Sequence, residues 1–345
     1  MRVADSTTQR NYLYYLDQAK TNYATTNARI ASGARFTTIS DDVSAGTRVL
    51  RVRADRAKAE EYLNTVKAVN EQLSVTENSI IAINSVLQAV HTKILKAENA
   101  TTGDSGRETL AGEIKNLQSE VLQYLNTKYN NTYVLGGSAS ANAPFTVDET
   151  SGALKYNGVE VSKIYYDSAS GNYMYDDGGM SKVVPMDSDI YADVGLGLRM
   201  VGSDVQSDTA FKVSYSGLEI IGISKDGTAP TGESNNIYDL LTKIREAMTS
   251  SDYLTTLGAL DTELTAKKDT FGKFITDVGT KTSYLETLEE SLNTKIDSYT
   301  SQISTLMGVD DAREATNQTL NDYVLKAVLS MGSKILPLSL MDYLN

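Results

Sequence analysis

The sequence predicts an α+β protein: an elongated antiparallel coiled-coil helical bundle from both chain ends, with one inserted small antiparallel β domain. All four prolines lie outside residues 1–143 and 231–336, and 14 of the 24 glycines fall between Gly136 and Gly232. Gly and Pro break helices and build turns. The two flanks are therefore predicted to form long helices, and the middle to form a different structure.

The first flank carries the strongest periodic signal. One apolar series recurs every seven residues, and a second series follows it three positions later. The members are Val66, Leu73, Ile80, Leu87 and Ile94, then Val69, Thr76, Ile83, Val90 and Ala97. Alternating spacings of three and four place both series on one seam, the a/d pattern of a coiled coil. A helix over residues 63–97 would be about 52 Å long at 1.5 Å per residue.

Further helical stretches are expected on both sides of the middle. The two glycines of Thr102–Gly106 predict a turn, after which a second apolar stripe folds back antiparallel. That stripe comprises Leu110, Ile114, Leu117, Val121 and Tyr124. In the second flank a helical stretch begins with Ile237, Leu241, Ile244 and Met248. A seven-residue repeat follows at Leu285, Leu292, Tyr299 and Leu306, and Ile296 and Ile303 are interleaved with it.

The middle, about residues 136–234, alternates apolar and polar residues in short runs. These runs are Lys155–Val161, Lys163–Tyr166, Asn172–Tyr175 and Phe211–Tyr215, separated by clusters such as Ser168–Gly171 and Asp176–Gly179. This pattern is typical of short antiparallel strands joined by tight turns. It predicts one small β domain between the helical flanks.

The two chain ends carry apolar stripes without an obvious local partner. Residues 8–36 show weak periodicity through Leu13, Leu16, Tyr23 and Ile30, among many poor helix formers. Residues 312–344 carry Leu320, Val324, Ala327, Met331, Ile335 and Leu338. A stripe without a partner is either frayed or available to another chain.

Composition excludes several classes of function. The formal net charge is −12 and the pI about 4.7, which argues against nucleic acid and against anionic membranes as partners. No apolar run approaches the roughly 20 residues of a membrane span. The first ten residues are polar and lack the apolar core of a cleavable signal peptide. Export would then use a route that reads no conventional signal.

Residues able to perform catalysis are scarce. The chain has no cysteine and one histidine, so a Cys–His pair and a histidine-rich zinc site are excluded. His91 lies beside the seam and is interpreted as structural or solvated. Asp176–Asp177 and Asp310–Asp311 lack the spacing of an EF-hand loop and are interpreted as solvated turns. No catalytic residue, cofactor or metal is expected, and the protein is predicted not to be an enzyme.

Both ends of the chain resemble the flagellin superfamily. Residues 32–66 contain Ser32-Gly33-Ala34-Arg35, Ser40-Asp41-Asp42 and Arg48-Val49-Leu50-Arg51 in the order that this family shows before its first long helix. The stretch Tyr133–Gly137 and the ending Ile335–Leu344, with its Ser-Leu-Met-Asp-Tyr-Leu tail, are similar to the hook–filament junction branch of the family. Val43 stands where that branch often has proline.

The resemblance implies a structural adaptor that joins the flagellar hook to the filament. Residues 1–42 with 306–345 would be terminal helices, disordered in the free monomer, that pair into an inner coiled-coil layer on assembly. Residues 43–135 with 235–305 would form a helical bundle domain, and 136–234 the outer β domain. The implied assembly contacts are Leu13, Leu16, Tyr23, Ile30, Arg35, Asp41, Asp42, Leu320, Val324, Met331, Ile335, Leu338, Leu340, Tyr343 and Leu344.

The same resemblance implies the partners and the place of work. These are identical subunits in a ring, another hook-associated protein on the hook side, flagellin on the filament side and an export chaperone, for a secreted protein of the flagellum. Asp41 and Asp42 have two interpretations, the start of a helix or an inter-subunit contact. Two other functions stay open, a filament flagellin and a secreted glycan- or matrix-binding protein that works through its β insert.

Overall fold

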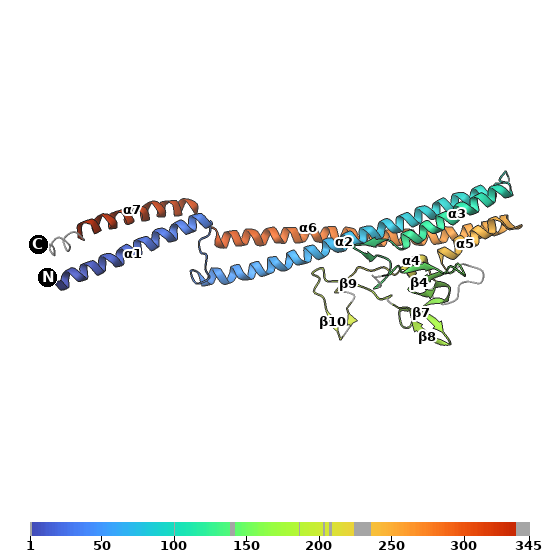
Figure 1. Ribbon diagram of the computed structural model, residues 1–345, viewed down its shortest axis with the longest axis horizontal. Coiled ribbons are helices and arrows are strands. Elements are labelled where there is room, and N and C mark those ends of the chain that lie inside the picture. Colours follow the sequence, from blue (N-terminus) through green and yellow to red (C-terminus); the bar gives the residue numbers. More distant parts are fainter. Residues whose placement is uncertain are drawn as a thin grey trace. The chain divides into compact units, whose positions relative to one another are not determined.

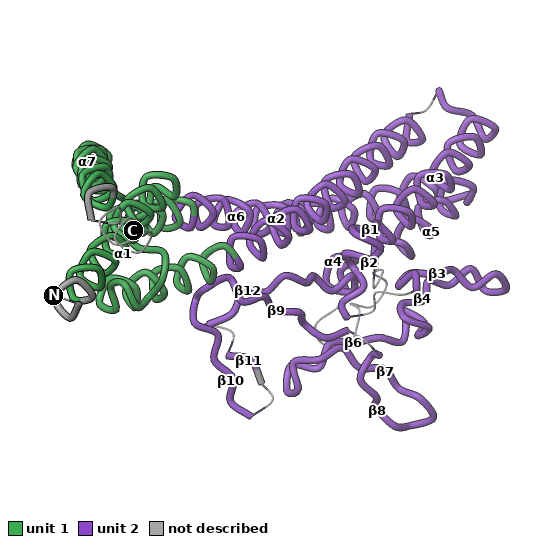
Figure 2. Tube along the Cα trace, turned by 60° about the vertical axis from the view of Figure 1, so that its left-hand side comes forward, with its two compact units in different colours: residues 1–60, 293–345 green, residues 61–292 purple. Residues whose placement is uncertain are grey.

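The computed structural model describes residues 2–99, 101–138, 142–185, 187–202, 204–206, 209–223 and 236–335. The chain divides into two compact units, Met1–Glu60 with Asn293–Asn345 (unit 1) and Glu61–Leu292 (unit 2) (Figure 2). Long helices pack together beside small antiparallel sheets (Figure 1). The predicted α+β fold class is confirmed. The predicted three layers concern the assembled polymer and stay a prediction.

The seam predicted from the sequence forms the core of the long helices in unit 2. Helix α2 (Val43–Glu98) buries all ten members of the two apolar series. Helix α6 (Tyr253–Met307) buries its own seven-residue repeat of Leu257, Leu264, Phe271, Val278, Leu285 and Leu292. The ion pair from Lys67 to Glu289 at 3.6 Å and the contact from His91 to Asp261 at 2.5 Å fix the two helices as antiparallel.

The repeat in α6 is longer on its N-terminal side than the sequence pattern indicated. The prediction began at Leu285, whereas the buried series begins four heptads earlier at Leu257. Within unit 2 it is continuous because every position opposite the α2 seam is filled by one large apolar side chain. The predicted residues that follow Leu292, such as Tyr299, are half-buried and belong to unit 1.

Helices α3 (Asp104–Leu125) and α5 (Ile237–Met248) pack on each other in unit 2. All four apolar residues predicted for α5 are buried. The buried face of α3 is Ala111, Ile114, Gln118, Val121 and Leu125, so the predicted stripe was correct at two positions. The face is rotated because Gln118 turns inward, where its Nε2 donates to the Tyr238 carbonyl at 3.0 Å and to Thr242 Oγ1 at 2.7 Å.

The turn before α3 lies earlier than predicted. The helix begins at Asp104, so Gly106 is helical rather than part of the turn. Arg107 holds this end of unit 2 together. Its guanidinium donates to the Thr102 carbonyl at 3.0 Å and the Met248 carbonyl at 3.3 Å, and it lies 3.8 Å from the centre of the Tyr253 ring.

The described middle of the chain forms short antiparallel strands, as predicted. The three-stranded sheets are β3-β4-β5 and β6-β7-β8, and the pairs are β1-β2, β9-β12 and β10-β11. The strands are β1 (Lys128–Tyr129), β2 (Thr132–Tyr133), β3 (Phe145–Val147), β4 (Leu154–Tyr156), β5 (Val159–Glu160), β6 (Ile164–Asp167), β7 (Asn172–Asp177), β8 (Met180–Val183), β9 (Tyr191–Ala192), β10 (Met200–Val201), β11 (Asp204–Val205) and β12 (Phe211–Lys212).

Three predicted boundaries in the middle were wrong. The run Lys155–Val161 is a hairpin rather than one strand, because Asn157 and Gly158 both adopt positive φ and reverse the chain between β4 and β5. Asp176 and Asp177 belong to β7, since the turn needs only the two following glycines. The run from Phe211 to Tyr215 is strand over its first two residues only.

Two packed clusters hold segments of this β region together within unit 2. Gly217 opens helix α4 (Gly217–Ile221) against the Phe145 ring, where a Cβ would lie 2.5 Å from a ring carbon. Asp187 accepts hydrogen bonds from the hydroxyls of the buried Tyr156 at 2.8 Å and of Ser216 at 2.7 Å. Burial raises the pKa of Asp187 above its ordinary value, against the effect of these two hydrogen bonds.

Candidate assembly interface

The two terminal helices pair with each other inside unit 1. Helix α1 (Arg2–Ser32) runs antiparallel to α7 (Asp311–Ile335), side by side along most of their length (Figure 1). Polar contacts set their register: Gln318 Nε2 donates to Asn27 Oδ1 at 2.8 Å, and Asn321 Nδ2 donates to Thr26 Oγ1 at 2.8 Å. The partner that was not visible in either local sequence is therefore the opposite end of the chain.

The buried residues of the α1/α7 contact are small or polar, whereas larger apolar side chains such as Leu16 and Tyr23 are half-buried. Ala19 and Thr26 are buried, and so is Glu314, which pairs with Arg29 at 3.6 Å. Gly332 also lies in the contact, where a Cβ would overlap the hydroxyl of Tyr12. Among the described residues of α1 and α7, no large apolar side chain is buried in this contact.

Eight large apolar side chains of the two helices are left exposed. Leu13 is 58% exposed, Leu320 60% and Tyr323 71%. The others in this set are Tyr14, Tyr15, Val324, Leu329 and Met331. So many exposed large apolar side chains on one pair of helices indicate a surface that serves an interaction. We call these eight residues the exposed apolar face.

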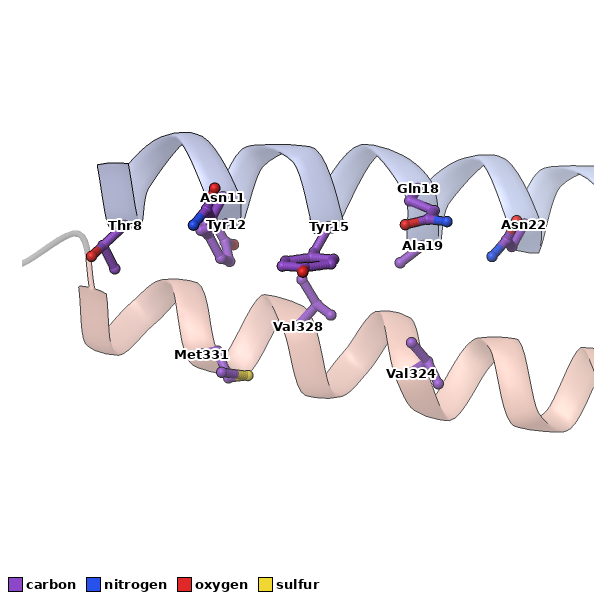
Figure 3. A pocket seen from close by; sticks show the side chains of 10 residues that line it. All are labelled: Thr8, Asn11, Tyr12, Tyr15, Gln18, Ala19, Asn22, Val324, Val328 and Met331. Carbon is purple, nitrogen blue, oxygen red and sulfur yellow. The ribbon is translucent and has the colours of Figure 1, made fainter. Parts of the chain in front are cut away.

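An apolar groove of about 400 Å³ runs between α1 and α7. Figure 3 shows Tyr15 and Val328 facing each other across it, with Val324 and Met331 on the α7 side. The lining contains no charged residue; it is formed by Thr8, Asn11, Tyr12, Tyr15, Gln18, Ala19, Asn22, Val324, Val328 and Met331. We call this cavity the α1/α7 groove.

A short joint connects the terminal pair to the start of α2 and the end of α6, also within unit 1. The Arg35 amide donates to the Met307 carbonyl at 2.7 Å, and the Val309 amide donates to the Gly33 carbonyl at 3.2 Å. Phe36 packs there against Ala45 and Val49 of α2, with Ile303, Leu306 and Met307 of α6 around them. The small core of unit 1 thus lies at the joint.

Charged residues of the predicted site organise the start of α2. Asp42 Oδ1 accepts from the Ala45 amide at 2.9 Å, a capping contact, and its Oδ2 pairs with Arg35 at 2.9 Å. Asp41 accepts from the amide of Thr38 at 3.1 Å, and hydrogen bonds from Thr38 lower the pKa of Asp41. The helix-start interpretation is confirmed for Asp42. An inter-subunit role for either aspartate stays a prediction.

The other predicted residues fall into three groups. Leu16, Tyr23 and Ile30 are half-buried along α1, whereas Leu13, Leu320, Val324 and Met331 belong to the exposed apolar face. Ile335 is the last residue of α7. Leu338, Leu340, Tyr343 and Leu344 lie outside the described residues. Whether these residues contact neighbouring subunits stays a prediction.

Sequence reasoning missed the polar register contacts and the tyrosines of the groove. Thr26 and Asn27 looked like poor helix formers. In α1 the threonines are accommodated because Thr25 Oγ1 donates to the Thr21 carbonyl at 2.8 Å, one turn back. The signal that could have found them is a polar residue in the middle of an apolar stripe at both chain ends.

His91 and Asp310 take part in contacts that hold helices in place. His91 contacts Asp261 across α2 and α6 in unit 2. No cluster of three or more potential metal ligands occurs among the described residues. Asp310 accepts from the Arg313 amide at 3.1 Å and so caps α7. A search of the described helices found none long and apolar enough to cross a membrane.

Comparison with known proteins agrees with this architecture. Residues 3–140 match the bacterial flagellin N-terminal helical region. The chain is 21% identical over 319 residues to flagellar hook-associated protein 3 of Escherichia coli K12, which covers 88% of this chain and 86% of that protein. It is 23% identical over 163 residues to hook-associated protein 3 of Salmonella typhimurium, covering 47% of this chain and 50% of that protein.

A solved structure supports the fold. The crystal structure of Bacillus cereus FlgL superposes with a TM-score of 0.50 at 17% identity, over 73% of this chain and 98% of that chain. The paired terminal helices, long heptad helices and flagellin N-terminal region define a flagellin-like structural subunit of the bacterial flagellum. Within that class, the chain is a relative of hook-associated protein 3. These relatives favour a hook–filament junction protein over the two alternatives, a filament flagellin and a glycan- or matrix-binding protein.

Proposed function

We propose that this protein is the adaptor that joins the hook of the flagellum to its filament. The observation that carries the proposal is the exposed apolar face of α1 and α7, which the single chain leaves in water. Burying such a face against neighbouring subunits offsets the entropy of ordering two terminal helices. Assembly and stabilisation of unit 1 would then be one event.

The proposal includes specific neighbours. Identical subunits pack side by side in a ring, with another hook-associated protein on the hook side and flagellin on the filament side. Residues 1–42 and 306–345 form the inner layer of the wall, 43–135 and 235–305 the next layer, and 136–234 the outer surface. The chain leaves the cell through the flagellar export channel and is held by an export chaperone before that step.

The site residues have distinct roles in this proposal. Leu13, Leu320 and Met331 contribute apolar area to the contacts between subunits. Arg35 and Asp42 hold the joint, since their ion pair spans the loop between α1 and α2. In this proposal the joint connects the inner layer of the wall to the next layer and transmits force between them. This role needs no catalytic residue.

Immunogold labelling of isolated flagella tests the position. An epitope tag is inserted between Gly178 and Gly179, an exposed turn between β7 and β8. We expect one narrow band of label where the hook meets the filament. Label along the whole filament would identify a filament flagellin instead, and label absent from flagella that retain motility would overturn the proposal. A tag inserted in the Ser168–Gly171 turn is the matched control. It shows whether a loss of label arises because the insertion between Gly178 and Gly179 itself blocks assembly.

A further inference from the structure

The first part of helix α2 is strongly basic, although the whole chain has a formal net charge of −12. Residues 48–58 contain five basic residues and one acidic residue. Arg48, Arg51 and Lys58 are exposed, and at about 100° per residue they lie within about 80° of one another around the helix. Asp55 lies among them, so this side of α2 keeps a net positive charge. We call these four residues the basic face.

The cations of the basic face are not neutralised by the part of the chain that the structure describes. The other two basic residues of the stretch have partners, since Arg53 contacts the sulfur of Met307 at 3.1 Å and Arg56 pairs with Glu60 at 3.1 Å. The three cations of the basic face form no ion pair with another described residue. Two of them are three positions apart on one helix and therefore repel each other. An acidic partner would relieve this repulsion.

Helix α6 carries an acidic face of nearly the same length. Glu286, Glu290 and Asp297 are exposed and lie within about 40° of one another around that helix. Lys295, the only lysine between Glu286 and Asp297, lies on the opposite side of it. At 1.5 Å per residue the basic face spans about 15 Å and this acidic face about 16.5 Å. One chain therefore presents two exposed faces of opposite charge and matching length.

We propose, on the basis of the ring in the proposed function, that the basic face of one subunit binds the acidic face of the next subunit. Neighbours in a ring point the same way, and α2 and α6 are antiparallel within each chain, so the two faces meet in opposite directions. Arg48 then lies level with Asp297, and Lys58 with Glu286. A contact between two unlike faces is heterologous and can close into a ring, whereas two basic faces repel each other.

The two kinds of surface have different tasks in the assembly. Ion pairs between exposed side chains contribute little to affinity, but complementary charges set orientation and register and exclude wrong pairings. The exposed apolar face of α1 and α7 supplies the area that holds the assembled subunits together. The basic and acidic faces lie on α2 and α6, which bury their own apolar seam within the single chain, so they do not require α1 and α7 to be ordered first.

Zero-length cross-linking with a carbodiimide tests the contact in the concentrated full-length chain at low ionic strength. The reagent joins an amine to a carboxylate that it touches, and Lys58 is the only lysine of the basic face. Unlabelled chains are mixed with chains labelled with heavy nitrogen, so a link between two copies appears in mass spectrometry as a mixed-isotope pair of peptides. We expect Lys58 to be linked to Glu286 or Glu290 of another copy. Lys273, which is exposed on α6 outside both faces, is the control and should give no comparable link.

Charge reversal at the other end of the contact separates electrostatic pairing from chance encounters. Arg48→Glu with Arg51→Glu should lower the yield of the link at least about tenfold, because two attractions become repulsions. Adding Asn293→Arg with Asp297→Arg on the acidic face should restore the yield, although the linked residues themselves are unchanged. Salt at about 1 M, where the Debye length is about 3 Å, should remove the link from the unchanged chain.

Two results would overturn the contact: no link from Lys58 between copies of the unchanged chain, or no recovery when the two arginines are added. Because the assay uses no flagella, it fails separately from the proposed function. Immunogold label at the junction without the link would keep the adaptor role and reject this contact. The link together with label along the whole filament would keep the contact and reject the adaptor role.

Discussion

The exposed apolar face makes a quantitative prediction about assembly. Leu13 and Leu320 lie on different helices and expose 58% and 60% of their surface in the single chain. Burying a whole leucine side chain is worth about 1.5–3 kcal/mol. About six-tenths of that remains to be gained at each position, so Leu13→Ala with Leu320→Ala should weaken association by about 2–4 kcal/mol. That range corresponds to a factor of about 30 to 1000 in the association constant.

The same two substitutions should barely change the free energy of unfolding of the single chain. Substitutions at exposed sites usually alter the free energy of unfolding by about 0.5 kcal/mol or less each. Urea denaturation should therefore give nearly the same midpoint as the unchanged chain. Binding is measured by co-sedimentation with hooks isolated from cells that lack their own junction subunit, over a series of chain concentrations.

A matched pair of leucines provides the control. Leu95 and Leu254 are 51% and 53% exposed but belong to unit 2, outside the proposed interface. Alanine at both should leave binding to hooks unchanged. The reasoning fails if the Leu13 and Leu320 variant binds within about threefold of the unchanged chain, or if the control pair loses as much.

Three further predictions concern the stability of unit 2, measured by urea denaturation. Arg107→Ala should cost about 2–4 kcal/mol, because two carbonyls lose a charged donor and an aromatic ring loses its cation; an unchanged midpoint would contradict this. Gly217→Ala should cost about 1–3 kcal/mol, since its Cβ would collide with the Phe145 ring, whereas Gly178→Ala has open space and tests backbone strain alone. The raised pKa of Asp187 means that the folded chain binds its proton more tightly, so this group lowers stability as pH rises from about 3.8 through its folded pKa. Asp187→Asn should therefore stabilise the protein more at pH 7 than at pH 3.5, and an equal effect at both values would refute the assignment.

The contrast between the two cores of the molecule bears on how this protein is used. Unit 2 fills each heptad of α6 with a large apolar side chain, from Leu257 to Leu292. The α1/α7 pair instead buries small or polar residues such as Ala19 and Thr26 and leaves large side chains such as Leu13, Leu320 and Tyr323 exposed. A helix pair of this kind gains little stability from its own contact and more from packing against neighbouring chains. An assembling subunit requires this property.

The sequence by itself determined the features that repeat locally. Heptads such as Val66 to Ile94 predict a buried seam because a helix places every seventh residue on nearly the same face. Glycine and proline placement located the β region for the same kind of local reason, since backbone conformation limits both residues directly. The order of motifs at the two ends indicated the flagellin superfamily before any contact was known.

Only the tertiary structure decided what lies between distant segments. Asn27 and Gln318 are 291 positions apart, and nothing in either local pattern shows that they meet. The rotated face of α3 followed from a partner, because Gln118 is buried only where α5 supplies two acceptors. Periodicity reports which side of a helix is apolar. Periodicity does not show which of these side chains find a partner within the chain and which are left for another subunit. That depends on contacts that form only when the two ends of the chain pack together.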